Sequence, residues 1–378
     1  MSDPVLVVIF LRGGADALNI VSPTGDADYI AARPDWLRVA RDGDDPGHVL
    51  GDGLADVEFR LHPRAKHLAE LFRAGDLSVI HATGLTEATR SHFEAEAQIE
   101  RAADGGEATG WLGRWLEAEA PGGPLPALAV GTAMPESLRG YHPAVAPSLP
   151  DLTVAPGHWL APALRARLAA GFGDHGALDQ TAEELLALSK VLENRLWLPK
   201  REEFRRYSPA VTYPKRNRLS DPLMTVAQTI KEDLGLRIAT VDYGGWDTHA
   251  DQKQTFDRLL QGLSAALMAF WRDLGPRQQD VSVVVMSEFG RRLRSNASGG
   301  TDHGRAGAML VLGPQTRGGR LLGAWPGLHS EALEMGADLA VTTDYRAVLA
   351  EILTAHMGLG DRARVFPGLD APAPGLFA

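Results

Sequence analysis

The sequence predicts an α/β protein whose mostly parallel central sheet is sandwiched by helices. Two short runs of consecutive apolar residues, 5–11 and 281–285, are typical of parallel strands that are buried on both faces. Between these runs, helical and apolar segments alternate along the chain, and this order indicates β–α–β units. The 378 residues, of which 44% are hydrophobic, can form a large core. We therefore expect a single domain over residues 1–378.

The other elements follow from the same patterns. Apolar runs predict further strands over 77–81, 236–242 and 309–312. Apolar residues at helical spacing predict helices over 181–197, 223–234, 256–274 and 345–357. The stretch 313–326 is expected to form a hairpin or loop. The Gly- and Pro-rich segment 105–215 predicts loops and short strands, and we interpret it as an inserted, loop-rich cap.

Composition excludes several classes of site. The chain has no cysteine, which leaves only oxygen and nitrogen ligands for a metal and excludes disulfides and cysteine nucleophiles. A net charge of −10 argues against a nucleic-acid or anionic-membrane surface, and no apolar run is long enough for a membrane span. The N-terminus carries no leader pattern, so we expect a soluble, cytoplasmic protein as written, or an exported, periplasmic one if a leader precedes it. The sequence does not predict an oligomeric state.

Carboxylates and imidazoles follow the predicted strands. Asp16 lies in a Gly-Gly turn after the first strand, where it equally suits a helix N-cap. Asp247 and His249 follow another Gly-Gly pair and share one face if the backbone is extended. Because ligands bind beyond the carboxyl ends of parallel strands, we expect these groups to converge. The predicted metal ligands are Asp16, Asp247, His249, Glu288, Asp302 and His303.

The stretch TRSHFEAEAQ predicts a helix that begins at Ser91. Ser91 and Glu94 have the spacing of a capping box, so Ser91 is explained structurally as a cap. The same position at a helix N-terminus suits a group that meets a phosphate or sulfate. Both interpretations stay open. The next residue, His92, could be a ligand or a surface residue, and we favour the surface.

These groups together suit divalent metal chemistry. Five or six oxygen and nitrogen ligands exceed the needs of one catalytic zinc and predict a pair of ions. A serine hydroxyl between them would become a nucleophile. The motifs G-x-S-x-G, G-x-G-x-x-G, the Walker loop and H-E-x-x-H are absent from the sequence, which argues against the corresponding hydrolase, nucleotide-binding and zinc-protease classes.

Five stretches carry a resemblance to a known family. FLRGGADALN, TRSHFEAEAQ, GGWDTH, SEFGR and GGTDHG resemble the domain-of-unknown-function 1501 (DUF1501) family, within the alkaline-phosphatase-like superfamily of phosphatases and sulfatases. They are spread over almost the whole chain in family order. The resemblance implies an alkaline-phosphatase-like fold with its site at the carboxyl ends of the strands. It also implies that Asp16 is the metal-bound aspartate after the first strand and that Ser91 is the nucleophile.

The second half of the motif set is less regular. The resemblance implies that Asp247 and His249 form an Asp/His pair, that Glu288 is the strand-end carboxylate and that His303 is the final histidine. Where the superfamily has Asp-His-Gly at this strand end, the chain has Glu288-Phe289-Gly290 and so lacks one imidazole. Asp302, next to His303, offers an alternative Asp-His element on a loop.

The leading hypothesis is a metal-dependent hydrolase or transferase that acts on a small-molecule phosphate or sulfate ester. It needs one or two divalent ions, Zn, Mn, Mg or Ca, and Arg12 or Arg90 would pair with the substrate's oxyanion. The first alternative is a catalytically silent binding or assembly protein that keeps the fold with one ion or none, and Phe289 favours it. The second is a metal-dependent enzyme of other chemistry, such as oxidation at an iron site.

Overall fold

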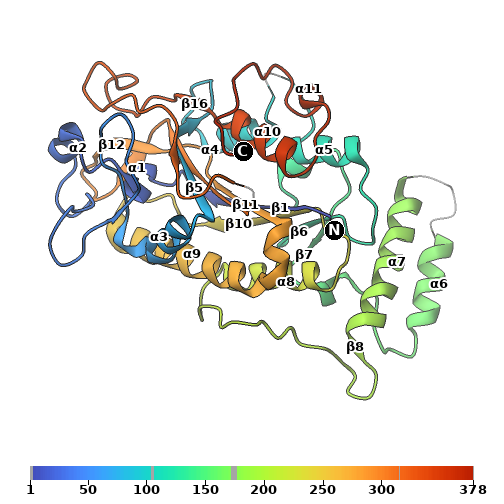
Figure 1. Cartoon of the computed structure of the whole chain (residues 1–378). Coiled ribbons are helices and arrows are strands. Elements are labelled where there is room, and N and C mark those ends of the chain that lie inside the picture. Colours follow the sequence, from blue (N-terminus) through green and yellow to red (C-terminus); the bar gives the residue numbers. More distant parts are fainter. Residues whose placement is uncertain (1–2, 104–105, 172–176, 315, 378) are drawn as a thin grey trace.

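The computed structural model describes residues 3–103, 106–171, 177–314 and 316–377, and one large β-sheet lies between two layers of helices (Figure 1). The strands are, in spatial order, β15 (Leu321–Leu322), β5 (Leu77–Gly84), β14 (Gly307–Leu312), β11 (Val281–Met286), β1 (Val5–Arg12), β10 (Ile238–Gly244), β6 (Ala127–Val130) and β7 (Ala144–Ala146); β16 (Thr343–Asp344) pairs with β5. Of these described strands, β14 alone runs antiparallel to its neighbours. The predicted mostly parallel sheet is confirmed.

The strand β1 shows why this sheet needs helices on both faces. Val7 and Ile9 belong to one buried apolar cluster, and Leu6 and Val8 belong to another. Side chains alternate between the faces of a strand, so each cluster lies on one side of the sheet. Burial of each such side chain contributes about 1.5–3 kcal/mol. The continuous apolar run in the sequence therefore reflects two cores that share one strand.

Helices contribute side chains to both cores. The first core includes residues of α3 (Lys66–Ala74), α8 (Ser220–Lys231) and α9 (Gln252–Leu274). The second includes residues of α4 (His92–Arg101), α5 (Trp111–Glu119) and α10 (Tyr345–Ala355). Figure 1 shows α9 and α3 on one side of the sheet and α10 and α5 on the other. The predicted sandwich of helices is thus confirmed.

Several shorter elements complete the chain. Near the N-terminus they are α1 (Ala17–Ile20), β2 (Val21–Ser22), α2 (Ala27–Ala32), β3 (His48–Val49), β4 (Arg60–Leu61) and η1 (Pro63–Ala65). In the second half they are η4 (Gly275–Asp280), β12 (Arg291–Ser295), β13 (Thr301–His303) and α11 (Arg362–Val365). The predicted strands and helices appear with shifts of a few residues at their ends. The segment 313–326, expected as a hairpin or loop, places β15 in the main sheet.

The segment 105–215, predicted as a cap, contributes partly to the sheet. Its strands β6 and β7 extend the sheet beyond β10. It also contains η2 (Glu136–Leu138), η3 (Leu149–Leu152), α6 (Ala161–Gly171), α7 (Ala177–Leu196), β8 (Trp197–Leu198) and β9 (Glu203–Phe204). The helices α6 and α7 stand side by side at one end of the molecule (Figure 1). The division into a cap and a main body remains a prediction.

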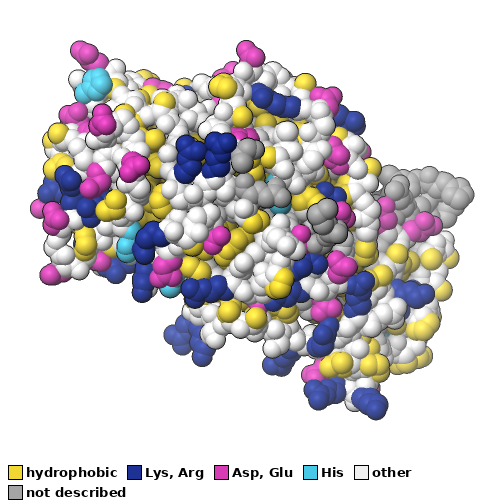
Figure 2. Space-filling view, viewed as in Figure 1, with side chains coloured by type: hydrophobic (Ala, Val, Ile, Leu, Met, Phe, Trp, Pro, Cys, Tyr) yellow, Lys and Arg dark blue, Asp and Glu magenta, His cyan; other side chains and the backbone are white. Residues whose placement is uncertain are grey.

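The visible surface has mixed charge. Figure 2 shows lysine and arginine side chains interspersed with aspartate and glutamate over this face, and hydrophobic side chains around the α6–α7 pair. Among the described residues, no helix has the length and hydropathy that crossing a membrane requires.

Candidate metal centre

Three neighbouring parallel strands direct their following loops to one edge of the sheet. Arg12 at the end of β1 pairs with Gly244 at the end of β10, and Phe10 pairs with Met286 at the end of β11. The segments after these strands, 13–16, 245–249 and 287–290, therefore start at the same edge. This edge is where open α/β sheets bind ligands.

Two glycines let these segments approach closely. Gly13 has a φ of 119°, and a Cβ there would lie 2.4 Å from the backbone nitrogen of Asp247. A Cβ on Gly300 would lie 2.4 Å from the carbonyl carbon of His249. Any larger residue at Gly13 or Gly300 would push the neighbouring backbone segments apart, because Cβ atoms do not come this close to other heavy atoms. The glycines thus bring the loops after β1 and β10 and the hairpin β12–β13 together.

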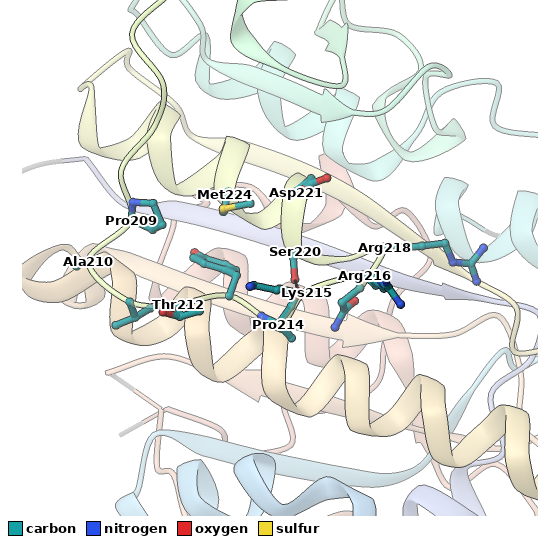
Figure 3. Close-up of a pocket in the computed structure, with 13 residues that line it drawn as sticks. Pro209, Ala210, Thr212, Pro214, Lys215, Arg216, Arg218, Ser220, Asp221 and Met224 are labelled. Atoms are coloured by element: carbon teal, nitrogen blue, oxygen red, sulfur yellow. Dashed lines mark hydrogen bonds between the residues drawn. The ribbon is translucent and has the colours of Figure 1, made fainter.

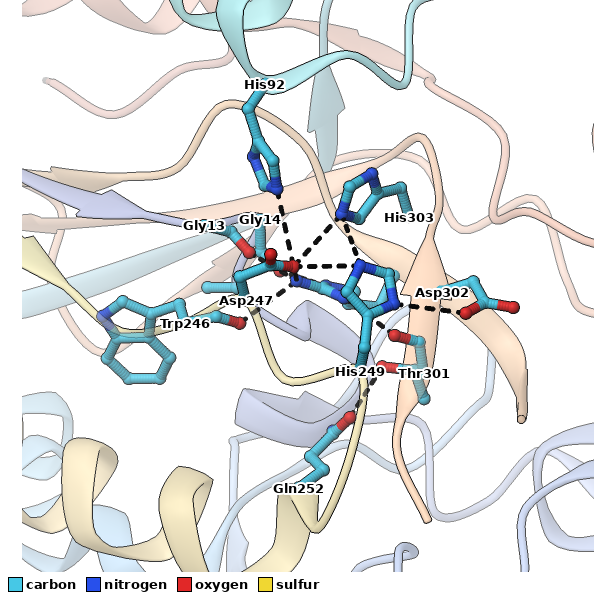
Figure 4. A network of polar contacts seen from close by, with 12 residues as sticks. Gly13, Gly14, His92, Trp246, Asp247, His249, Gln252, Thr301, Asp302 and His303 are labelled. Atoms are coloured by element: carbon cyan, nitrogen blue, oxygen red, sulfur yellow. Dashed lines mark hydrogen bonds and ion pairs between the residues drawn. The ribbon is translucent and has the colours of Figure 1, made fainter. Parts of the chain in front are cut away.

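Three imidazoles and one carboxylate converge at this edge (Figure 4). His249 Nε2 lies 2.8 Å from His303 Nε2, and each of these atoms lies 3.1 Å from Asp247 Oδ1. His92 Nε2 approaches the same oxygen at 3.5 Å. We call His92, Asp247, His249 and His303 the histidine cluster. Four potential ligand atoms of this cluster therefore face one small region.

The outer nitrogen of each ring fixes its tautomer. His303 Nδ1 lies 2.8 Å from the carbonyl oxygen of Arg90, which can only accept, so Nδ1 must carry the proton. His249 Nδ1 lies 3.2 Å from Asp302 Oδ1, and His92 Nδ1 lies 2.8 Å from Glu288 Oε1. In the neutral rings, the Nε2 atoms are therefore bare lone pairs that face inward. Such outer-shell acceptors are the usual partners of metal-binding histidines.

The inward-facing nitrogens lack ordinary partners. Two bare Nε2 atoms at 2.8 Å, those of His249 and His303, need a proton or a cation between them. His92 Nε2 is buried and has no hydrogen-bond partner among the described residues. A divalent ion would satisfy all three nitrogens, because neutral imidazole nitrogen is a common metal ligand. The donor set of the cluster thus fits a metal ion.

Arg291 holds the carboxylate of the cluster. Its Nη2 donates to Asp247 Oδ1 at 2.6 Å, while Nε donates to the carbonyl of Gly14 at 2.6 Å. Burial would raise the pKa of Asp247, but the hydrogen bond and the positive charge of Arg291 outweigh it and lower this pKa to about 2. The carboxylate is thus ionised at neutral pH. Its side chain is 48% exposed, so the cluster is open to a substrate.

Glu288 supports the cluster from behind. Its side chain is fully buried, and its Oε1 accepts from the Gly13 amide and from His92 Nδ1, both at 2.8 Å. Ser287 Oγ lies 2.9 Å from its other oxygen, Oε2, and 2.7 Å from the carbonyl oxygen of Leu11, so these two acceptors compete for the one hydroxyl proton. The hydrogen bond to Glu288 raises the pKa of His92 more than burial lowers it. In this arrangement Glu288, predicted as a ligand, orients His92.

Phe289 has an unexpected place beside the histidines. Its ring centroid lies 5.0 Å from that of His92 and 4.9 Å from that of His303. A Cβ on Gly14 would lie 2.3 Å from the Phe289 ring, so the turn after β1 needs a glycine here. The sequence indicated that Phe289 removes an imidazole. In the structure His92 brings an imidazole to the same cluster from α4.

Two other predicted ligands lie outside the four-residue cluster. Asp16 is fully buried, and its two oxygens each accept from Arg33 at 2.9 Å. Gln252 Nε2 also donates to Asp16 at 2.7 Å, so the carboxylate is satisfied by protein donors. Asp302 contacts His249 and accepts from Asn296 at 3.0 Å. Asp302 thus supports a histidine, whereas Asp16 is not brought to the cluster.

The predicted anion partners are also paired with carboxylates. Arg12 forms ion pairs with Glu100 and, at 3.0 Å, with Asp242. Arg90 pairs with the fully buried Asp338. The structure therefore does not present either guanidinium as a free anion partner at the cluster. Sequence alone could not reveal these pairs, because the partners of Arg12 and Arg90 lie more than eighty residues away.

Ser91 begins α4 as predicted, but not through a capping box. Its side chain makes no cap hydrogen bond. Instead Thr89 Oγ1 accepts from the Ser91 amide at 3.2 Å and donates to Glu94 at 2.8 Å. Ser91 lies between Arg90, whose carbonyl accepts from His303, and His92, a member of the cluster. Its hydroxyl is thus not engaged in capping the helix beside the candidate centre.

Sequence reasoning missed two residues of this centre. His92 was considered as a ligand but expected at the surface, although its position directly after Ser91 was a usable signal. Arg291 is buried, and it donates to Asp247. It also donates, over 2.7 Å or less, to the backbone carbonyls of Gly13, Gly14 and Thr301. A buried arginine with these partners has no sequence signature, because its partners come from three separate segments.

A separate hollow of about 730 Å³ lies between the segment 209–218 and the start of α8 (Figure 3). Lys215, Arg216 and Arg218 line it together with Asp221. Arg218 Nη2 donates to the carbonyl of Gly244 at 2.9 Å. None of the predicted site residues is among those that line this hollow. The candidate centre is therefore the histidine cluster.

Comparisons with known proteins bear on the family. The model of a family described as "Protein of unknown function (DUF1501)" matches residues 202–369. Three of the five motifs, GGWDTH, SEFGR and GGTDHG, lie within this stretch, and the match confirms the predicted family resemblance. No curated protein matches the chain in sequence.

Solved structures with some similarity to this chain include the following three. The Zn complex of the C-terminal periplasmic domain of EcEptC from Escherichia coli has 7% identity and a TM-score of 0.38, with 83% of this chain and 74% of that chain covered. The sulfatase PsFucS1 from Pseudoalteromonas sp. has 10% identity and a TM-score of 0.38, with 100% and 74% covered. The alkaline phosphatase of the Antarctic bacterium TAB5 has 10% identity and a TM-score of 0.36, with 83% and 93% covered.

Proposed function

We propose that the histidine cluster binds a divalent metal ion and that the protein is a metal-dependent hydrolase or transferase acting on a phosphate or sulfate ester. The observation that carries the proposal is the convergence of three tautomer-fixed Nε2 atoms on Asp247 Oδ1. Among Zn, Mn, Mg and Ca, three imidazoles favour Zn, because Mg, Ca and Mn prefer oxygen ligands. A bound ion would supply Lewis-acid stabilisation of charge on the ester oxygens.

Ser91 is the proposed nucleophile. It lies directly before His92, and its hydroxyl is free of capping duty. Its Oγ would form a bond to the phosphorus or sulfur as the bond to the leaving alcohol breaks, and the hydroxyl proton would pass through solvent to the leaving oxygen. The resulting ester on Ser91 would pass its group to water in a hydrolase or to an acceptor alcohol in a transferase. Cluster and nucleophile together support a two-step transfer.

The start of α4 is the proposed contact for the anion. No side chain caps its first turn, so backbone amides remain available to ester oxygens. Arg12 and Arg90 are paired with carboxylates, and we do not assign the anion to them. The substrate's negative charge would thus be met by the bound ion and by these amides.

The test combines metal loading with two variants of Ser91. The protein loaded with Zn, Mn, Mg or Ca is assayed with aryl phosphates and aryl sulfates. Ser91→Ala should lose turnover while its unfolding free energy stays within about 0.5 kcal/mol, because no cap bond is lost. Ser91→Asp should fold equally well and also lose turnover. The control Thr89→Ala removes the hydroxyl that holds the first turn and should lower stability but keep turnover. Full activity in either Ser91 variant would refute the nucleophile.

Two rival functions are separated by the same preparation. Three imidazoles also suit iron, which favours a metal-dependent enzyme of other chemistry; iron-dependent absorption bands in the visible spectrum would support it. The pairing of Arg12 and Arg90 with carboxylates favours a silent binding or assembly protein. Bound metal without turnover of any of these esters would support that second rival.

A further inference from the structure

A second group of potential ligands adjoins the histidine cluster. Ligand atoms of His92, Glu96 and Glu288 lie within 4.8 Å of one another, as do those of His92, Asp247 and His303. Sequence reasoning expected a pair of ions. The two groups share His92, so they would serve neighbouring ions if both were occupied. The number of ions therefore depends on what already satisfies the second group.

Protein donors already satisfy the glutamate at its centre. Glu288 Oε1 accepts from the amide of Gly13 and from His92, and its Oε2 competes with the carbonyl of Leu11 for the proton of Ser287. The side chain is fully buried. An ion here would compete with these donors for the same oxygens, and its binding would be weakened because the donors would lose their hydrogen-bond partner.

The guanidinium of Arg12 contacts three carboxylates, those of Glu96, Glu100 and Asp242. Arg12 Nη1 pairs with Glu100 and lies 3.6 Å from Glu96 Oε2, and Arg12 Nη2 lies 3.0 Å from Asp242 Oδ1. The guanidinium carbon lies 4.0 Å from the centroid of the Phe10 ring, which holds it from another side. Arg12 is the last residue of β1, so the sheet itself fixes its backbone. Its charge is permanent at any physiological pH.

We propose that Arg12 stands in for a second metal ion, so that the protein holds a single divalent ion on the histidine cluster. This inference rests on the metal site of the proposed function. The Arg12 guanidinium neutralises Glu96, Glu100 and Asp242, while the Gly13 amide and His92 already occupy Glu288 Oε1. Arg12 is thus a positioning residue whose guanidinium keeps a second metal ion away from Glu96, Glu100 and Asp242.

The test counts bound ions in the full chain. Wild type is loaded with zinc chloride, freed of excess zinc, and analysed by elemental analysis and by titration calorimetry with Zn²⁺. We expect one equivalent for wild type and two for Arg12→Gln, in which the second ion would take the place of the guanidinium among Glu96, Glu100 and Asp242. The matched control Arg12→Lys keeps the charge and should stay at one. Two equivalents in wild type, or one in folded Arg12→Gln, would overturn the inference.

A second variant covers poor folding of Arg12→Gln. Glu96→Gln removes a potential ligand of the second group and should still bind one equivalent, with its zinc affinity changed less than about threefold. A drop in the zinc count on this substitution would show that Glu96 binds metal and would overturn the inference. Failure of the proposed function has a different signature: wild type would then bind no zinc at all, whereas two equivalents would leave the proposed function standing.

Discussion

The same local pattern, Gly-Gly-x-Asp, follows two adjacent strands of the sheet and gives two different carboxylates. After β1 it places Asp16, and after β10 it places Asp247. Asp16 is fully buried, whereas the side chain of Asp247 is 48% exposed. Both were predicted as metal ligands from the pattern. Only Asp247 joins the histidine cluster of the described structure.

The difference arises from the arginine that each carboxylate meets. Arg33 binds both oxygens of Asp16 in a fork, and this leaves no free face for an ion. Arg291 donates to Asp247 Oδ1 through Nη2 alone, whereas its Nε and Nη1 donate to backbone carbonyls. A single donor orients Asp247 and keeps it ionised, yet leaves room for the histidines. The bidentate pair with Arg33 thus makes Asp16 a structural carboxylate, whereas the single hydrogen bond from Arg291 leaves Asp247 a potential ligand.

The largest expected effect comes from Asp16→Asn. The amide nitrogen would face donors of Arg33 or Gln252, and the buried guanidinium would lose its counter-charge. We expect the unfolding free energy to fall by about 3–5 kcal/mol, measured by urea denaturation. Zinc content per folded molecule should be unchanged. The opposite result, intact stability with lost zinc, would make Asp16 a ligand and end the distinction between the two carboxylates.

The next effect is expected for Asp247→Asn. The amide oxygen still accepts from Arg291, but this fully buried guanidinium loses its counter-charge, so the unfolding free energy of the metal-free protein should fall by about 1–3 kcal/mol. The loss is smaller than in Asp16→Asn because the Asp247 side chain is 48% exposed. The loss of the carboxylate charge should weaken zinc binding more than about 100-fold, since even an outer-shell change costs 10–100-fold. Chelation should lower the melting temperature of wild type but not of this variant. Equal zinc affinity in both proteins would remove Asp247 from the centre.

The comparison also shows how far the sequence carries. Apolar runs such as 5–11 predicted the strands, because a strand buried on both faces needs apolar side chains throughout. The glycines after β1 and β10 predicted the turns and the edge at which the groups meet. The sorting of Asp16 from Asp247 was out of reach, because it depends on Arg33 and Arg291, which come from other segments.

His92 also shows the limit of prediction from sequence, because a residue of the cluster was expected at the surface. A lone histidine at a helix start is commonly a surface residue, and its partners Glu288 and Asp247 lie 196 and 155 positions away in the chain. The parallel order of β1, β10 and β11 brings those partners to the start of α4. The substitution of phenylalanine at position 289 was visible in the sequence. That an imidazole from α4 would stand beside it was not.

The smallest expected effect tests the outer support of the cluster. Asp302 Oδ1 lies 3.2 Å from His249 Nδ1 and accepts from Asn296, but its side chain is 47% exposed. In Asp302→Asn the amide oxygen can still accept from His249, so the tautomer is kept and only the charge is lost. We expect zinc affinity to fall about tenfold, the low end for an outer-shell change, as measured by competition with a chromogenic chelator. The control Asp45→Asn alters a carboxylate of similar exposure, 56%, that pairs with Arg64 instead, and should leave zinc affinity unchanged. A loss above about 100-fold in Asp302→Asn would make Asp302 a direct ligand, and no loss would mean that Asn296 and the backbone alone orient His249.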